Sequence, residues 1–256
     1  MAINKAGKIL LNFKKRGTTE NNINGGGALL SENTAFHVRE AYKAMRTNVM
    51  FSVPEEGCKV IGVTSAVPSE GKSTTVLNLA ITFAETGSKV ILIDADMRRP
   101  NIKKILNAGE SAGLSDVLAR FVTPREVISA SGYENLDVIF SGNIPPNPVE
   151  LLASDTMKDL IESLKAEYDY IFIDTPPINV VTDATVVSRL VHGIIMVTRE
   201  NVSRKDEVAE AMNKLLFVNA KILGLVLNDR MYQSKRRTRY GKYKRYYYYR
   251  DYERHD

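Results

Sequence analysis

The residues with the clearest chemical potential follow a short apolar run. Residues 60–63, Val-Ile-Gly-Val, predict a buried strand, and an apolar pattern of helical spacing begins at Thr75. Between them, residues 71–74 read Gly-Lys-Ser-Thr at the predicted joint of loop and helix. The free N–H groups and the dipole of a helix start favour an anion there, so this layout predicts a phosphate-binding loop, or P-loop.

Each residue type in this loop suits contact with a nucleotide. Gly71 lets the backbone approach the phosphates, and Lys72 is predicted to reach the β- and γ-phosphates. The Ser73 hydroxyl is predicted to bind Mg²⁺ and the Thr74 hydroxyl to bond the α-phosphate. The predicted nucleotide-binding residues of the loop are Glu70, Gly71, Lys72, Ser73 and Thr74.

Three aspartates end two further apolar runs. Residues 88–96 predict a buried strand that ends in Asp94 and Asp96, and residues 168–174 predict another that ends in Asp174. Parallel strands bring their carboxyl ends to one edge of a sheet, where ligands bind. If the phosphoryl acceptor is a tyrosine, we predict that Asp94 takes its proton, although Asp94 and Asp96 could exchange roles. The predicted catalytic residues are Lys72, Asp94 and Asp96, and the predicted Mg²⁺ ligands are Ser73, Asp96 and Asp174.

Strands alternate with helices along the chain, which predicts an α/β fold with a mostly parallel sheet and helices on both faces. Thr123 is predicted to cap a short helix, and Ser203 to cap a longer one. Further strands are expected at residues 136–140, 193–198 and 221–227, and further helices at 34–50, 114–118, 123–128, 149–164, 183–190 and 203–217.

Charge divides the 256 residues into three parts. Residues 233–256 hold nine Lys/Arg and three Asp/Glu, a net charge of +6. Residues 1–30 carry five Lys/Arg and one Glu, so residues 31–232 are mildly acidic. We expect a flexible basic segment at 1–33, a P-loop domain at 34–230 and a disordered basic tail at 231–256. The chain has a single cysteine, and we find neither an apolar run of about 18 residues nor a signal peptide. These features favour a cytoplasmic location.

The tail is rich in tyrosine. Seven of the twelve tyrosines lie between Tyr240 and Tyr252 and alternate with Lys and Arg, with almost no aliphatic residue to build a core. Such a segment could bind single-stranded nucleic acid by stacking and charge, or simply be a sticky tail. We favour a third interpretation, in which the tyrosines are phosphorylated by the chain itself, and we expect no nucleic-acid partner. They are Tyr240, Tyr243, Tyr246, Tyr247, Tyr248, Tyr249 and Tyr252.

Five segments in this order resemble the bacterial tyrosine kinases (BY-kinases) of capsular and extracellular polysaccharide systems, whose fold is that of the MinD/ParA-like P-loop NTPases. The resemblance implies a protein-tyrosine kinase that uses ATP and Mg²⁺ and autophosphorylates its tyrosine cluster. It also implies regulation of polysaccharide synthesis and export. The segments are VTSAVPSEGKST, KVILIDADMRRP, GLSDVL, PPNPVELLAS and YIFIDTPP.

The family resemblance also implies partners. Its E-x-x-R-x-x-R motif, at the interface of a ring-shaped homo-oligomer, reads Glu40-x-x-Lys43-x-x-Arg46 here. A plain solvated face is the alternative for these charges. A separate membrane activator or adaptor would recruit the kinase to the inner face of the cell membrane. A cognate tyrosine phosphatase and polysaccharide synthesis proteins are the other implied partners.

Two rival functions and one open residue remain. A MinD/ParA-type positioning ATPase would carry a signature lysine after the first glycine of the loop, but this chain has Ala66 and then Val67. Alanine should be tolerated if the first turn avoids strained φ. A nucleotide-gated scaffold without kinase activity is the second rival. Asn228, at the end of the last predicted strand, would read the adenine edge or form an Asx turn.

Overall fold

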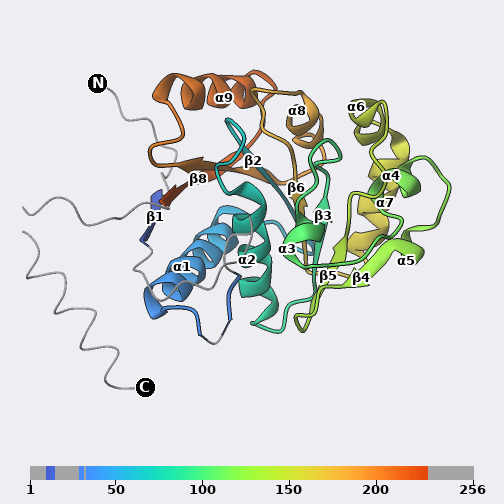
Figure 1. Cartoon of the computed structure of the whole chain (residues 1–256), viewed down its shortest axis with the longest axis horizontal. Helices are drawn as coiled ribbons and strands as arrows, with labels where there is room; N and C mark the ends of the chain where they lie inside the picture. Colours follow the sequence, from blue (N-terminus) through green and yellow to red (C-terminus); the bar gives the residue numbers. More distant parts are fainter. Residues whose placement is uncertain (1–9, 15–28, 32, 230–256) are drawn as a thin grey trace, which may run out of the picture.

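One central sheet organises the molecule (Figure 1). The computed structural model describes residues 10–14, 29–31 and 33–229. Within them the strand order is β1-β8-β7-β2-β6-β3-β5-β4, and all neighbours run parallel except β4, which is antiparallel to β5. The strands are β1 (Leu10–Lys14), β2 (Lys59–Ser65), β3 (Val90–Asp94), β4 (Ile128–Ala130), β5 (Leu136–Ile139), β6 (Tyr170–Asp174), β7 (Gly193–Arg199) and β8 (Ile222–Asp229).

Helices cover both faces of this sheet, which confirms the predicted architecture (Figure 1). Helices α1, α2 and α3 contribute to the core on one face, and α4, α7, α8 and α9 contribute to the cores on the other. The helices are α1 (Phe36–Ser52), α2 (Lys72–Ala84), α3 (Ile102–Ile105), α4 (Leu114–Leu118), α5 (Pro124–Val127), α6 (Pro148–Leu152), α7 (Asp155–Lys165), α8 (Asp183–Val187) and α9 (Lys205–Phe217).

The central strands are apolar throughout because both of their faces are covered. In β3, Val90 and Leu92 belong to the apolar cluster that includes α1 and α2, whereas Ile91 and Ile93 belong to the cluster that includes α4 and α7. None of these four side chains is exposed. Successive side chains on a strand point to opposite faces, so a strand buried twice needs a continuous apolar run. The same rule makes β3 and β6 rigid supports for the aspartates that end them.

The helix predicted over 149–164 is wrong, because the structure contains two helices there. Helix α6 ends at Leu152 and α7 begins at Asp155. The Ser154 hydroxyl accepts a hydrogen bond from the Met157 N–H and so caps α7. A serine inside an apolar pattern was the missed signal, since its side chain competes for backbone groups and favours a helix start. Helix α3 and the antiparallel strand β4 were also not predicted.

The N-terminal part differs from the flexible segment expected at residues 1–33. Leu10–Lys14 form β1, which pairs in parallel with β8 from Leu225 to Asp229. Without β1 the backbone groups on that edge of β8 would lack strand partners, which gives the pairing a physical reason. The remaining calls on residues 1–9, 15–28 and 231–256, including the tyrosine tail, lie outside the described residues. No helix within the described ranges is long and apolar enough to cross a membrane.

Candidate nucleotide and phosphoryl-transfer site

The predicted P-loop joins β2 to α2, at the carboxyl edge of the sheet. Gly71 has φ of 87° and immediately precedes α2. A side chain at Gly71 would collide with the amide of Asn228, so both the backbone angle and the close approach require glycine. The N–H groups of the first turn of α2 lack helical partners, which suits them to bind phosphate.

Ala66 takes the place of the first glycine without backbone strain. It is fully buried, and it is absent from the residues with positive φ within the described chain. The left-handed conformation falls instead on Ser69, with φ of 67°. The condition set for alanine at this point of the loop, an unstrained backbone φ, is therefore met.

Lys72 lies at the centre of the site and is almost fully buried. Its Nζ is 2.7 Å from Asp174 Oδ1 and 3.6 Å from Asp96 Oδ2. Burial opposes the charged form, but attraction from Asp174 and Asp96 outweighs it and raises the pKa of Lys72. The Ser73 hydroxyl donates to Asp174 Oδ2 at 2.6 Å. Ser73 of α2, Asp96 after β3 and Asp174 at the end of β6 thus all lie within contact distance of the Lys72 side chain.

Asp94 lies beside this centre but deeper in the molecule. It is not exposed, and its two carboxylate oxygens accept backbone N–H groups of Asp96 at 3.3 Å and Ile102 at 3.2 Å. Burial, and then repulsion from Asp174, raises the pKa of Asp94 to about 8, against the attraction of Lys72. A carboxyl group with this proton affinity is suited to accept a proton near neutral pH.

The acidic residues fit a Mg²⁺ ion that arrives with a nucleotide. Among the described residues, no cluster of three or more acidic, His or Cys side chains forms a complete metal cage. Mg²⁺ seldom needs one, because it commonly takes one or two carboxylates together with phosphate oxygens and water. The Ser73–Asp174 pair and the nearby Asp96 supply such a partial set of oxygen donors.

Glu70 holds the loop rather than pointing at a ligand. Its carboxylate accepts the Val67 N–H at 2.8 Å and a short hydrogen bond from the Ser203 hydroxyl. Burial raises the pKa of Glu70. The Asn228 side-chain amide donates to the Glu70 carbonyl at 3.0 Å. Asn228 therefore binds the backbone of the P-loop, and its contact with adenine stays a prediction.

Two loop-holding residues were not recognised in the sequence. Ser203 was predicted to cap the helix that follows, but α9 begins at Lys205 and its N-cap residue is Arg204. The Ser203 hydroxyl instead accepts the Arg199 N–H at 2.6 Å, and Arg199 Nη1 donates to the Ser69 carbonyl at 2.9 Å. Only the adjacency of β7 to β2 brings these groups to the P-loop.

The three residues of α1 predicted at an oligomer interface, Glu40, Lys43 and Arg46, lie apart from this site. Lys43 Nζ pairs with Glu40 Oε1 at 2.9 Å on the exposed side of the helix. Arg46 turns inward, and its Nη1 donates to the Thr82 carbonyl of α2 at 2.7 Å. Arg46 therefore also fastens α1 to the P-loop helix, a role that spacing alone did not reveal.

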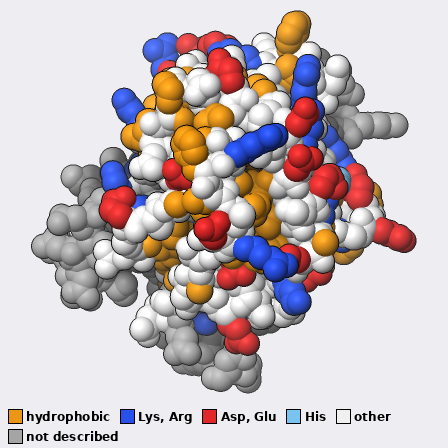
Figure 2. Space-filling model, turned by 90° about the vertical axis from the view of Figure 1, so that its right-hand side faces the viewer, with side chains coloured by type: hydrophobic (Ala, Val, Ile, Leu, Met, Phe, Trp, Pro, Cys, Tyr) orange, Lys and Arg blue, Asp and Glu red, His pale blue; other side chains and the backbone are white. Residues whose placement is uncertain are grey.

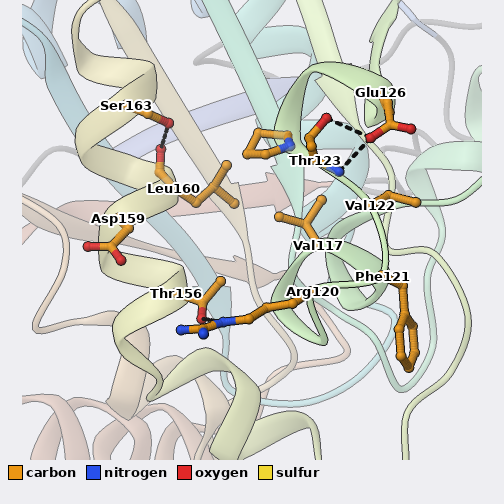
Figure 3. Close-up of a pocket in the computed structure, with 11 residues that line it drawn as sticks. Val117, Arg120, Phe121, Val122, Thr123, Glu126, Thr156, Asp159, Leu160 and Ser163 are labelled. Atoms are coloured by element: carbon orange, nitrogen blue, oxygen red, sulfur yellow. Dashed lines mark hydrogen bonds between the residues drawn. The ribbon is translucent and has the colours of Figure 1, made fainter.

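A separate hollow of about 530 Å³ lies between the α4–α5 segment and α7 (Figures 2 and 3). Its floor includes the buried Val117 and Leu160, and Phe121 stands at its rim with 80% of its surface exposed. Arg120 Nε donates to the Thr156 hydroxyl at 3.2 Å across it. None of the predicted site residues lines this hollow.

Comparisons with known proteins agree with this geometry. A family model described as an AAA domain matches residues 58–216. The tyrosine-protein kinase YwqD of Bacillus subtilis is 39% identical over 204 residues, which cover 80% of this chain and 85% of YwqD. The putative tyrosine-protein kinase CapB of Staphylococcus aureus is 39% identical over 191 residues, 75% of this chain and 84% of CapB.

Solved structures give the same result. The kinase domain of the Escherichia coli tyrosine kinase ETK has a TM-score of 0.76 and 35% identity, and the match covers 82% of each chain. The chimerical protein CapA2B2 has a TM-score of 0.73 and 37% identity over 78% of this chain and 87% of that one. MinD of Pyrococcus horikoshii, 26% identical over 66% of this chain and 70% of its own, has a TM-score of 0.57.

The kinase matches are closer than the MinD match in identity and TM-score, which sets aside the positioning ATPase. They also set aside a scaffold without activity, because the relatives are named tyrosine-protein kinases. A P-loop with Val67 in place of a signature lysine accords with this result. The chain belongs to the bacterial tyrosine kinases (BY-kinases) of the capsule family and is a protein-tyrosine kinase with a nucleotide-binding P-loop.

Proposed function

We propose that this kinase transfers the γ-phosphoryl group of ATP to the tyrosines of its own C-terminal tail, mainly between subunits. The observation that carries the proposal is the buried Lys72 with Asp174 and Asp96 beside it, in a chain that also holds seven closely spaced tyrosines. The lysine offers positive charge to a transferring phosphoryl group, and the cluster offers many acceptors.

The residue roles follow from charge and position. The backbone N–H groups of the P-loop from Glu70 to Thr74 bind the phosphates, and the Lys72 side chain stabilises the charge that develops on the transferred group. Ser73, Asp96 and Asp174 hold Mg²⁺, which supplies charge neutralisation when bound. Asp94 accepts the tyrosine proton. Asn228, which already contacts the P-loop backbone, orients the adenine.

The tail acts as a charge switch in this proposal. About 28 residues follow Asn228. A random-coil chain of that length would span roughly 30 Å, which would be enough to reach a neighbouring subunit. The tail's net charge of +6 attracts it to the mildly acidic domain. Each phosphate adds about −1.5 to −2 charges, so three or four would cancel the positive charge. Attraction becomes repulsion, and phosphorylation releases the oligomer.

Helix α1 is proposed as the oligomer interface. Glu40 and Lys43 lie on its exposed side, where a neighbour's charges can replace their intrachain pair. A ring follows if the two faces in contact differ and the rotation closes. Glu40→Lys should give smaller species in light scattering, with an unchanged melting temperature because the residue is on the surface. An unchanged mass would mean that Glu40 lies on an ordinary solvated face of the helix and not at an interface.

The proposed partners and place in the cell complete this function. A membrane activator or adaptor recruits the cytoplasmic kinase to the inner membrane face, and a tyrosine phosphatase reverses its modification. The kinase regulates polysaccharide synthesis and export through the proteins of that system. The named relatives CapB and CapA2B2 support a capsule role, and the chimerical character of CapA2B2 supports a partner chain.

A mixing experiment tests the route of transfer. Full-length Lys72→Met protein, which lacks transfer activity but keeps its tail, is mixed with active protein that lacks residues 231–256. With ATP and Mg²⁺, phosphotyrosine on the Lys72→Met tail is the expected result and demonstrates transfer between subunits. Absence of phosphotyrosine in this mixture, with full labelling in wild type, would mean that transfer occurs within one chain. Sizing before and after ATP tests the release, and an unchanged mass after full phosphorylation contradicts it.

A further inference from the structure

A bidentate ion pair joins two loops at the edge of the candidate site. Arg98 Nε lies 3.0 Å from Asp183 Oδ2 and 3.3 Å from Asp183 Oδ1, and Arg98 Nη2 donates to Oδ1 at 3.1 Å. Such a fork fixes direction as well as distance, because two roughly parallel N–H groups meet one carboxylate. The pair therefore resists both translation and rotation of one loop against the other.

The two loops carry the carboxylates that face Lys72. Arg98 follows Asp96 by two residues, and Asp183 opens α8 at the end of the loop that follows Asp174. The backbone adds one further bond, from the Ala95 N–H to the Asp174 carbonyl at 2.8 Å. Beyond that point, the Arg98–Asp183 pair is the side-chain link between the Asp96 loop and α8 among the described residues.

Because Asp183 is buried, this ion pair depends on whether its cation is an arginine or a lysine. Asp183 has no exposed surface, whereas the Arg98 side chain is 37% exposed. A buried carboxylate without its cation is strongly unfavourable, so the Asp183 carboxylate requires the Arg98 guanidinium at this position. Lysine would keep the charge but offer a single point contact in place of the fork.

We propose that Arg98 and Asp183 are positioning residues that set the Asp96 carboxylate at its distance from Asp174 and Lys72. The pair acts through the loop backbone and touches neither nucleotide nor tyrosine. This inference rests on the proposed function, in which Asp96 and Asp174 hold Mg²⁺. It adds a structural cause for their separation, which neither strand alone determines because Asp96 lies beyond the end of β3.

Hydrogen–deuterium exchange of the free protein, without metal or nucleotide, tests the positioning directly. Arg98→Lys should increase exchange about tenfold at the amides of residues 95–99, which include the Arg99 N–H bound to Asp96 Oδ1, and leave α2 unchanged. Arg204→Lys is the matched control, because Arg204 makes a similar fork to Asp206 on the exposed surface. Equal exchange at 95–99 in Arg98→Lys and wild type would overturn the proposal.

Kinetics supply the second measurement. Arg98→Lys should lower kcat about tenfold and raise the Mg²⁺ concentration for half-maximal rate, with the KM for ATP unchanged. Loss of ATP binding in proportion to kcat, with a lower melting temperature, would indicate a general structural defect and contradict positioning. An Asp96→Asn arm separates the two hypotheses. If Asp96→Asn is inactive and Arg98→Lys is normal, the pair is not a positioning device; if Asp96→Asn is fully active, the proposed metal role itself fails.

Discussion

Two regions of the molecule offer a place for a ligand, and they are built in opposite ways. At the carboxyl edge of the sheet, Lys72, Asp94 and Asp174 are buried ionisable groups fixed by strand ends and hydrogen bonds. In the hollow between α4–α5 and α7, the floor is apolar and Phe121 points outward (Figure 3). The difference teaches that fixed, desolvated charge marks a reaction centre more reliably than open volume does.

Replacing Lys72, at the carboxyl edge of the sheet, should lower kinase activity more than any other change to either region. Lys72→Met removes the cation that faces Asp174 at 2.7 Å and would leave the transferring phosphoryl group without its charge partner. We expect phosphotyrosine formation to fall about 10³-fold in a quantitative blot while the mutant stays folded by circular dichroism. Retention of most of the activity would mean that the P-loop is not the site of transfer.

The two aspartates that follow β3 should then separate base from metal ligand. We expect Asp94→Asn to lower kcat about 10²-fold, because the proton acceptor is lost, while Mg²⁺–ATP binding by calorimetry is kept. Asp96→Asn should weaken Mg²⁺–ATP binding. Normal binding in Asp96→Asn with weak binding in Asp94→Asn would reverse these two roles.

The burial of charge at the centre also predicts a pH dependence of stability. In the free protein the pKa of Asp94 is raised from 3.8 to about 8. Protonated Asp94 therefore contributes fully to the free energy of unfolding below about pH 4, and this contribution is lost as the pH rises through about 8. Urea unfolding at about pH 5 and pH 8 should therefore show a larger loss of free energy of unfolding for wild type than for Asp94→Asn. Parallel losses in the two proteins would contradict the raised pKa, since Asp174 and Lys72 are common to both.

The hollow should give the smallest effect. Phe121→Ser removes an exposed apolar side chain from the hollow, which no predicted site residue lines. We expect kcat and KM for ATP to stay within about twofold of wild type, and stability within about 0.5 kcal/mol, as for most surface substitutions. A drop in kcat comparable with that of Asp94→Asn would erase the distinction between the two regions.

Much of the fold was readable from the sequence because the pattern is local. Apolar runs at residues 60–63, 88–96 and 168–174 predicted strands that the structure confirms with small shifts of their ends. Alternation of strand and helix predicted the parallel sheet. The break at Ser154 was missed because the apolar spacing continues across it, and β1 was missed because its pairing with β8 joins residues more than 200 positions apart.

The sequence by itself determined which groups are the candidates for the chemistry, since a Gly-Lys-Ser loop and strand-terminal aspartates have few other uses together. Tertiary structure alone decided how they meet. The order β2-β6-β3 places Asp174 between the P-loop and Asp94, and the register aligns Asp94 with Asp174. Arg98 pairs with Asp183, 85 positions away in the chain, and Ser203 hydrogen-bonds to Glu70, 133 positions away. Such pairs depend on strand order and crossover packing, which sequence spacing does not encode.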